Sequence, residues 1–313
     1  MVRRYVLQYL FPRGADGLPD RGVIDGALQQ TPAQLAACAV HAAPPRQLHP
    51  DRLGPQHRRS DTMSHLYGKF VWFEYMSGDS VSASRFYDAL FGWRTVDTPM
   101  GGPQPYPLIM NGSEGIGGFR AAAPGAAAMW MPYVSVREVN VAHAAALAAG
   151  GSSVMPPTDF GPVGRGATLA DPAGAVFSVW PGSQGDRADA AKTPVGDWHR
   201  NELMTPDVPR ALAFYEGVVG YDHDTRDMGA QGSYYLLKIG ARMRAGLMHS
   251  PIPDTPPMGV AYVAVADCDA TAAQARPLGA RLIVEPTDIP NVGHFATLLD
   301  PQGACIAFMK PFD

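Results

Sequence analysis

The sequence predicts an α+β protein built from two copies of one module. The first observation behind this prediction is an internal repeat: the stretch from Glu74 to Trp93 recurs as the stretch from Glu202 to Tyr221, at a constant offset of 128 positions. The second is the order of patterns in each copy, namely an apolar strand, an amphipathic helix, and short strands separated by glycine and proline. The length of 313 residues agrees with two domains of ordinary size.

The helix that opens each copy is delimited at both ends. Asp79 and Asp207 are suited to cap the two helix N-termini, because an aspartate side chain accepts hydrogen bonds from free backbone N–H groups there. Gly92 and Gly220 follow the last apolar positions and predict the helix ends. Apolar residues at i, i+3, i+4 and i+7 predict one buried face in each helix, and they are Ala83, Phe86, Tyr87 and Leu90, then Ala211, Phe214, Tyr215 and Val218.

The other segments of the first copy predict strands and one more helix. Its first strand, residues 70–76, is apolar on both faces except at Glu74, which is typical of a strand covered on both sides. The elements expected after the first helix are strands at 106–110, 115–119 and 130–136, a helix at 140–149, and strands at 168–170 and 175–180. The sequence Asp171-Pro172-Ala173-Gly174 between the last two strands predicts a type I turn.

The second copy repeats this order. Its expected elements are strands at 198–204, 234–239, 244–248 and 260–265, helices up to residue 219 and over 270–276, and a final hairpin that ends at Phe308. The modules therefore span residues 66–181 and 197–313, with a polar, flexible linker at 182–196. Residues 1–62 are rich in arginine and proline and lack lysine and glutamate. We expect this extension to be disordered and the native translation start to lie at Met63.

Composition excludes several classes of function. The formal net charge of -4 offers no basic surface to a phosphate backbone, so nucleic acid is not expected as a partner. No apolar run approaches the roughly 18 residues of a membrane span, so a membrane is not expected either. The three cysteines, Cys38, Cys268 and Cys305, show no CxxC spacing, which indicates reduced thiols and a cytoplasmic protein.

A strand, a helix ending in FY...G[WY], three further strands, and the same order again closing on a DPxG hairpin resembles the vicinal oxygen chelate superfamily. This superfamily includes glyoxalase I, bleomycin-resistance proteins and extradiol dioxygenases. The stretch from Trp72 to Asp79 is most similar to its two-module, glyoxalase-like bacterial members. The resemblance implies four βαβββ units that form two curved, barrel-like mixed sheets with the helices outside. It also implies that a concave sheet face holds the ligand.

Enzymes of this superfamily hold a divalent metal with His or Glu side chains, and the resemblance places those ligand positions on residues that bind metals poorly. The positions are Trp72 and Arg200, Gly118 and Gly246, Met131 and Val260, and Ser178 and Ala307. No metal site and no cofactor are therefore predicted. A divalent metal held by residues outside this alignment stays open as an alternative.

Glu74 and Glu202 are the two candidate catalytic residues. Each lies two residues beyond the first of these ligand positions, on the same strand face by the period of two. An ionised carboxylate in an apolar strand is unfavourable unless it is paired or functional. One hypothesis is a general base or polar anchor in the cavity. The other is a structural carboxylate that accepts hydrogen bonds from the backbone or from a nearby arginine.

Several large side chains are expected to bind a flat apolar or aromatic ligand on the concave face. The predicted ligand-binding residues are Trp72, Met76, Trp130, Tyr133, Trp180, Arg200 and Tyr262. A stripe of aromatic and methionine side chains is also typical of an ordinary core, which is the alternative. Arg200 could hold a carboxylate or enolate oxygen of the ligand, or it could pair with Glu202. The histidines with no metal-binding spacing are His199, His249 and His294.

The function predicted first is the binding of a small, largely apolar or aromatic organic molecule in a concave, metal-free pocket. The alternative is a lyase, isomerase or oxygenase of the same superfamily, which would use Glu74 or Glu202 as a base, or a metal. A third class, a purely structural protein, requires that bulky side chains fill both pockets. The repeat favours a monomer that contains an internal pseudo-dimer, or a homodimer.

Overall fold

The computed structural model describes residues 65–99, 104–123, 125–229, 232–251, 255–290 and 292–312. The extension 1–62, which is expected to be disordered, and the expected start at Met63 lie outside the described residues, as does Cys38. The described part covers nearly all of both repeat copies.

The two copies fold with the same order of elements. The first contains β1 (Phe70–Ser77), α4 (Ser80–Phe91), β2 (Arg94–Thr98), β3 (Tyr106–Asn111), β4 (Glu114–Ala121), β5 (Met129–Ser135), α5 (Val139–Ala148), β6 (Ser152–Asp159), β7 (Arg165–Ala170) and β8 (Val176–Trp180). The second contains β9 (Trp198–Thr205), α6 (Val208–Val219), β10 (Asp222–Asp227), β11 (Ser233–Ile239), β12 (Arg242–His249), β13 (Met258–Ala264), α7 (Cys268–Ala275), β14 (Arg281–Ile289), β15 (Gly293–Leu299) and β16 (Cys305–Pro311). These elements form four βαβββ units, so the α+β prediction is confirmed.

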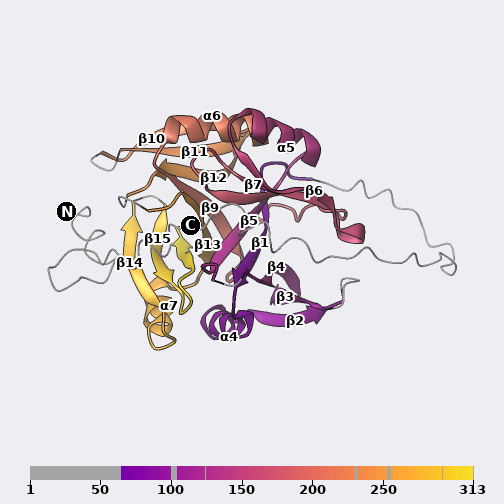
Figure 1. Cartoon of the computed structure of the whole chain (residues 1–313). Coiled ribbons are helices and arrows are strands. Elements are labelled where there is room, and N and C mark those ends of the chain that lie inside the picture. Colours follow the sequence, from indigo (N-terminus) through magenta and orange to yellow (C-terminus); the bar gives the residue numbers. More distant parts are fainter. Residues whose placement is uncertain are drawn as a thin grey trace.

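Each copy forms one eight-stranded mixed sheet. The strand orders are β2-β3-β4-β1-β5-β8-β7-β6 and β10-β11-β12-β9-β13-β16-β15-β14. In both sheets the first strand is parallel to one neighbour and antiparallel to the other, β1 between β4 and β5 and β9 between β12 and β13. The sheets are curved (Figure 1), but their edge strands do not pair with each other. The prediction of two curved, barrel-like mixed sheets is therefore confirmed, and both sheets are open.

The first helix of each copy begins and ends where the sequence predicts. Asp79 and Asp207 each accept a hydrogen bond from the backbone N–H three residues later, at 3.0 and 3.2 Å. Gly92 and Gly220 end α4 and α6 with φ of 72° and 84°, a left-handed conformation that glycine adopts without steric cost. The buried residues of both helices are the eight apolar residues that the spacing predicts. None of the helices within the described ranges is long and apolar enough to cross a membrane.

The edge strands are the elements that the sequence did not reveal. β2 and β10, with the sequences RTVDT and DHDTRD, are almost entirely exposed and polar, so they lack the alternation that marks a half-buried strand. The opposite edges, β6 and β14, contain prolines and pair with register shifts.

Two hydrophobic cores join the modules. The first core combines Phe73 and the buried face of α4 with Val263, Phe308 and the buried residues of α7. The second combines Val134, Phe177 and the buried residues of α5 with those of α6. Figure 1 accordingly shows α4 beside α7 at one end of the molecule and α5 beside α6 at the other. Each core thus takes residues from both modules, so neither module buries its apolar surface alone.

Two motif tyrosines form reciprocal hydrogen bonds across the modules. The Tyr87 hydroxyl on α4 donates to Asp300 Oδ2 in the second module at 2.9 Å, and the Tyr215 hydroxyl on α6 donates to Asp171 Oδ2 in the first at 3.3 Å. Asp171 and Asp300 open the two DPxG turns, where their other carboxylate oxygens accept backbone N–H groups. The repeated FY and DPxG motifs therefore hold the two modules together.

The last aromatic residue of each repeat makes a second reciprocal pair. Trp93 Nε1 donates to the Gly196 carbonyl at 2.7 Å, and the Tyr221 hydroxyl donates to the Gly68 carbonyl at 2.6 Å. Both glycines precede the first strand of the opposite module and have a left-handed backbone, with φ of 79° at Gly68 and 81° at Gly196. The interface is therefore isologous, as in a symmetric dimer, within a single chain.

The segment 182–196 between the modules contains no helix or strand. Its Asp186 carboxylate accepts the Leu66 N–H at 2.6 Å and the Ser135 hydroxyl at 2.7 Å, both in the first module. Its Asp189 carboxylate pairs with Arg244 of the second module at 2.8 Å. The segment, which we expected to be flexible from its composition, is fixed to both modules at these points.

Candidate functional site

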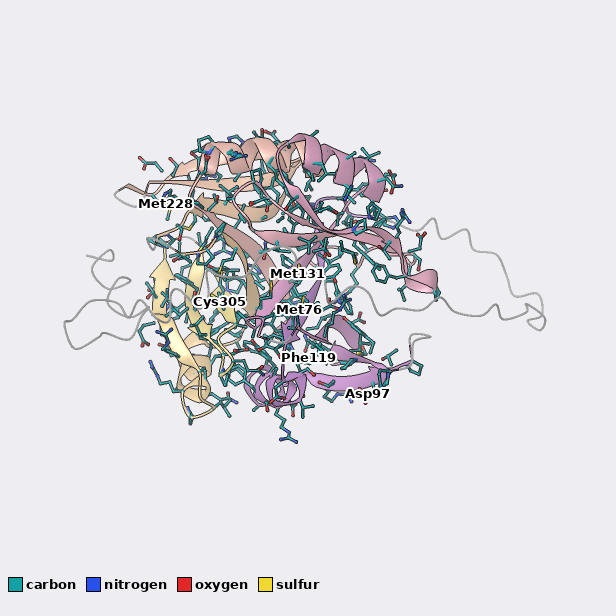
Figure 2. All side chains as sticks on the ribbon, viewed as in Figure 1. Met76, Asp97, Phe119, Met131, Met228 and Cys305 are labelled. Carbon is teal, nitrogen blue, oxygen red and sulfur yellow. The ribbon has the colours of Figure 1, made fainter. Side chains whose placement is uncertain are left out.

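Each sheet has one face covered by helices and an opposite face, which we call the helix-free face. On β1, Phe73 and Tyr75 point into the core beneath the helices. Because side chains alternate along a strand, Trp72, Glu74 and Met76 lie on the helix-free face. Figure 2 shows Met76 and Met131, from the neighbouring strands β1 and β5, near the centre of the molecule.

A β-bulge precedes the first candidate side chain in each module. The pairing of β1 with β5 shifts between Phe70 and Trp72, and the pairing of β9 with β13 shifts between Trp198 and Arg200. A bulge reorients the side chains that follow it and is common beside functional sites. Trp72 and Arg200, which occupy the same place in the repeat, are thereby directed onto the helix-free faces.

Glu74 is the centre of a group of polar side chains that we call the first cluster. The hydroxyls of Tyr106 and Tyr133 donate to Glu74 Oε1 and Oε2 at 2.9 and 2.8 Å. The Arg120 guanidinium lies 3.1 Å from Glu74 Oε1, and Trp72 Nε1 donates to the Tyr106 hydroxyl at 3.3 Å. The Glu74 side chain is only 2% exposed. The carboxylate is therefore buried, and both of its oxygens accept hydrogen bonds.

Glu202 has the same arrangement in the second cluster. The Tyr234 hydroxyl donates to Glu202 Oε2 at 2.7 Å, and the Tyr262 hydroxyl donates to Oε1 at 3.0 Å. Arg200 completes this cluster, with its guanidinium carbon 4.6 Å from the centre of the Tyr262 ring. Among the described residues no carboxylate lies within ion-pair distance of Arg200, so the expected alternative of an Arg200–Glu202 pair is not found.

Glycine makes room for one tyrosine in each cluster. A Cβ atom added at Gly118 would overlap the Tyr106 hydroxyl, and one added at Gly246 would overlap the Tyr234 hydroxyl. Gly118 pairs with Glu74 across β4 and β1, and Gly246 pairs with Glu202 across β12 and β9. The absence of a side chain at these two positions therefore lets each tyrosine reach its carboxylate.

Burial and the nearby carboxylates act together on the cluster tyrosines. Burial first, and the charge of Glu74 or Glu202 second, raise the pKa of four hydroxyls above its usual value, those of Tyr106, Tyr133, Tyr234 and Tyr262. Burial, the largest single influence, lowers the pKa of Arg120, but Glu74, Tyr133 and Tyr106 together outweigh it, so the pKa of the guanidinium is raised. At neutral pH the tyrosines are thus protonated donors and Arg120 is charged.

Aromatic side chains adjoin the first cluster. The Trp180 ring lies edge-on to Tyr133, with centroids 6.2 Å apart, and 5.6 Å from Phe160. It packs over Gly166, where an added Cβ would collide with the indole. Trp72, Tyr106, Tyr133, Phe160 and Trp180 are all only partly buried. The helix-free face of the first module therefore presents ring surface around a buried carboxylate.

The expected role of Trp130 on this face is wrong. Trp130 pairs with Tyr75, lies in the core with Trp93 and Trp198, and donates from Nε1 to the Tyr87 hydroxyl at 2.9 Å. Tyr133 lies three residues away on the same strand, and a strand places residues three apart on opposite faces. Trp130 therefore belongs to the core between the modules.

The helix-free face of the second module is more apolar and more closely filled. Val260, Tyr262, Ala307 and Met309 form a fully buried group there. Partly buried apolar side chains pack against it, and they include Met204, Met258, Ile289 and Phe295. Of the predicted binding residues in this module, Tyr262 is 2% exposed and Arg200 is partly exposed.

The positions onto which the resemblance places the superfamily's metal ligands are unsuited to hold a metal ion in this chain. Two are glycines whose space the tyrosine hydroxyls occupy, and Ser178, the best remaining oxygen donor, is hydrogen-bonded to Thr168 at 2.9 Å. The described residues contain no group of three His, Cys, Asp or Glu side chains that could hold a metal ion. The donor set is thus unsuited to a divalent metal, and we derive no chemistry from one.

Other reactive side chains lie apart from the clusters. Burial raises the pKa of the thiols of Cys268 and Cys305 to about 11 and about 12, so both are protonated at neutral pH. His294 is hydrogen-bonded to Asp288 at 2.6 Å. Cavities of about 20 and 160 Å³ are each lined by residues of both modules and include neither Glu74 nor Glu202.

Three cluster residues were not identified from the sequence. Tyr106 and Tyr234 recur at the same offset as Glu74 and Glu202, so the repeat carried a signal for both. Arg120 carried none, because its counterpart in the repeat is Met248. Its contact with Glu74 depends on the parallel pairing of β1 with β4, two strands that are far apart in sequence.

Comparisons with known proteins agree with this architecture. The family model described as the Glyoxalase/Bleomycin resistance protein/Dioxygenase superfamily matches residues 199–308, and the model of a glyoxalase-like domain matches residues 75–180. A protein named "Putative glyoxylase CFP32" from Mycobacterium tuberculosis (strain CDC 1551 / Oshkosh) is 37% identical over 245 residues, which cover 77% of this chain and 94% of that protein. The anthracycline biosynthesis protein DnrV of Streptomyces peucetius is 30% identical over 254 residues, covering 76% and 91%.

Solved structures share the fold at low identity. The Mn(II)-bound glyoxalase from Novosphingobium aromaticivorans superposes with a TM-score of 0.59 at 15% identity, over 79% of this chain and 83% of that chain. The 2,2',3-trihydroxybiphenyl 1,2-dioxygenase from Sphingomonas wittichii strain RW1 superposes with a TM-score of 0.56 at 13% identity, over 78% and 91%.

Proposed function

This chain belongs to the glyoxalase/bleomycin resistance protein/dioxygenase superfamily, and from that premise we propose that its first module binds a small, flat, largely apolar or aromatic organic molecule. The site is the helix-free face around the first cluster. The observation that carries the proposal is the set of partly exposed rings around the buried, fully hydrogen-bonded Glu74, and these rings are Trp72, Tyr106, Tyr133, Phe160 and Trp180. Ring faces supply large contact area at little entropic cost.

Polar groups of the first cluster would orient the ligand. The hydroxyls of Tyr106 and Tyr133 donate their hydrogen atoms to Glu74. Towards a ligand, their oxygens therefore act as hydrogen-bond acceptors. Arg120 is 35% exposed and has further N–H donors beyond its contact with Glu74. The face therefore suits a ligand with an aromatic body, a hydroxyl group for a tyrosine oxygen, and a carbonyl oxygen for Arg120.

The arrangement of Glu74 favours binding over acid–base catalysis. A general base must come within hydrogen-bond reach of the proton that it removes. The Glu74 oxygens lie beneath two tyrosine hydroxyls and an arginine, and the raised pKa of these tyrosines makes their hydroxyls poor proton donors. The hydrogen bonds of Glu74 thus favour the role of a polar anchor, and those of Glu202 in the second cluster favour the same role. The alternative of a lyase, isomerase or oxygenase would need a different group to perform the chemistry.

A relative supports the proposed class of ligand. DnrV is named as a protein of anthracycline biosynthesis, and anthracyclines are flat polycyclic aromatic molecules that carry hydroxyl and carbonyl groups. Such molecules match both the ring surface and the polar groups of the first cluster. The relative from Mycobacterium tuberculosis is named as a glyoxylase, so the enzyme alternative is represented in the same family.

Isothermal titration calorimetry with an anthracycline tests the proposal. We expect binding to the wild-type chain, and a loss of about fivefold or more in affinity for Trp72→Ala and for Trp180→Ala, since each removes a stacking contact of about 1 to 3 kcal/mol. Trp198→Phe is the control, because Trp198 belongs to β9 of the second module and packs against the core between the modules, away from the helix-free face of the first module. Unchanged affinity in both alanine variants would exclude this face as the site.

A further inference from the structure

The two modules each place one arginine on the helix-free face, but from different strands. At the repeat offset, Trp72 on β1 corresponds to Arg200 on β9, and Arg120 on β4 corresponds to Met248 on β12. The charge is therefore conserved in each cluster while its position has changed. The two faces consequently differ in what the arginine can bind.

Arg120 and Arg200 differ in their partners. Arg120 is neutralised by the Glu74 carboxylate 3.1 Å away. In the described part of the chain Arg200 has no carboxylate within ion-pair distance, and the oxygens of Glu202 accept hydrogen bonds from Tyr234 and Tyr262. The Arg200 Nε atom is buried and has no hydrogen-bond partner among the described residues. Leaving such a donor unsatisfied costs about 1 to 3 kcal/mol, so the Arg200 guanidinium retains hydrogen-bonding capacity for an acceptor.

The surroundings keep Arg200 charged and leave the histidine beside it neutral. Burial alone would lower the pKa of Arg200, but Tyr234, Glu202 and Tyr262 together raise it. The other titratable group that adjoins it is His199, whose pKa is lowered to about 4 by burial and by Arg200 itself. At neutral pH the guanidinium is therefore a cation in a partly buried position, stacked on the Tyr262 ring.

An apolar, adaptable surface lies on the same face as Arg200. Phe295 lies 6.3 Å from Tyr262, the ring on which Arg200 stacks. Met204 and Met258 are paired on β9 and β13 two register positions beyond Glu202 and Val260, and Ile289 belongs to the same apolar group. Methionine side chains adjust to irregular apolar shapes. A cation beside such a surface is complementary to a molecule with an anionic end and an apolar body.

We propose that the helix-free face of the second module is a separate binding site for an apolar or aromatic carboxylate, whose two oxygens are held by the Arg200 guanidinium. The planar fork of arginine N–H groups matches a carboxylate in this way. The site is independent of the one in the first module, where the arginine is already paired. The chain would thus hold two ligands of different charge on its two faces.

Benzoate and benzamide are the probes that test this site, because they share shape and differ in charge. Calorimetry in a low-salt buffer without other carboxylates or phosphate is expected to show at least tenfold tighter binding of benzoate than of benzamide to the wild-type chain. Arg200→Met should remove this preference. Arg226→Met, which removes an exposed arginine of β10, is the control for net charge and should retain it.

Methionine methyl NMR locates the binding site without any variant at Arg200. With 13C-labelled methionine methyl groups, assigned through Met204→Leu and Met258→Leu, benzoate should shift the signals of Met204 and Met258 and leave those of Met76 and Met131 in place. Equal affinity for benzoate and benzamide, a benzoate preference that survives Arg200→Met, or shifts confined to Met76 and Met131 would each overturn the proposal. The wild-type titration decides the question even if Arg200→Met does not fold.

Discussion

At the scale of single residues, a buried glutamate in each module is stabilised by two tyrosine hydroxyls. Glu74 and Glu202 are 2% and 4% exposed, and each would be strongly unfavourable as an ion in an apolar strand. Hydrogen bonds to both carboxylate oxygens offset this desolvation, and Arg120 adds a counter-charge in the first cluster. The expectation of a structural carboxylate bonded by an arginine thus describes part of the first cluster, and the tyrosines supply the rest.

Replacement of the Glu74 carboxylate measures how much the first cluster contributes to the free energy of unfolding. Glu74→Gln leaves only one acceptor oxygen for two hydroxyls and leaves Arg120 without a counter-charge, so we expect the free energy of unfolding to fall by about 2 to 4 kcal/mol. Urea denaturation provides the measurement. The control is Glu114→Gln, which breaks an exposed 3.4 Å pair with Arg187 and should change stability by less than about 1 kcal/mol. Equal effects of the two substitutions would contradict the assigned role of Glu74.

At the scale of elements, two glycines in β4 and β12 determine whether the clusters can form. Gly118 and Gly246 face the tyrosines of the neighbouring strands β3 and β11. The resemblance to the superfamily carries a metal-ligand position onto each of these glycines, and tyrosine hydroxyls occupy the space that a ligand side chain would need there.

Gly118→Ala should displace Tyr106 from Glu74. The added methyl group has no room beside the hydroxyl, so we expect a loss of about 1 to 3 kcal/mol in stability and weaker ligand binding at the first cluster. Gly217→Ala is the matched control, because Gly217 lies within α6 with open space around it, and alanine there should stabilise the helix by about 0.5 to 1 kcal/mol. If Gly118→Ala retained both stability and affinity, the glycine would not be required for the tyrosine contact.

The sequence predicted the elements that combine a strong period with caps, and it missed those that have neither. The buried faces of α4 and α6 and their glycine ends follow from local spacing, so they were predicted correctly. The exposed edge strand β10 has no apolar period to detect. Trp130 lies on the opposite face from the predicted one, because strand alternation separates it from Tyr133 three residues away. Arg120 depends on a parallel crossover that no local pattern shows.

At the scale of the whole molecule, the chain is an internal pseudo-dimer whose motifs serve the interface. The tyrosines of the repeated FY motif reach the DPxG aspartates of the opposite module, and both hydrophobic cores contain residues of both modules. The helix-free faces differ in the position of their arginine. Trp72 and Arg200 occupy one position of the repeat, and Arg120 and Met248 occupy another. The residues that both copies share thus hold the fold and form the glutamate–tyrosine contacts of both clusters, and the different arginine positions distinguish the two faces.

The shared cores predict that the two modules unfold together. Differential scanning calorimetry of the full chain should show one transition for both modules, with equal calorimetric and van't Hoff enthalpies. Tyr87→Phe removes a hydroxyl that donates to Asp300 and accepts from Trp130, and we expect it to lower the single melting temperature by several degrees. Two separated transitions, or a Tyr87→Phe effect on only one of them, would show that the modules are independent.

Carboxylate–tyrosine clusters occupy the positions onto which the resemblance carries the superfamily's metal ligands, so we expect ligand binding without a metal. Elemental analysis of the purified, dialysed protein, followed by calorimetry of anthracycline binding with and without chelator, tests this expectation. We expect well under one equivalent of Zn, Ni, Mn or Fe, and the same affinity and melting temperature in the presence of chelator. One equivalent of metal that survives dialysis, and whose removal by chelator abolishes binding and lowers the melting temperature, would contradict it.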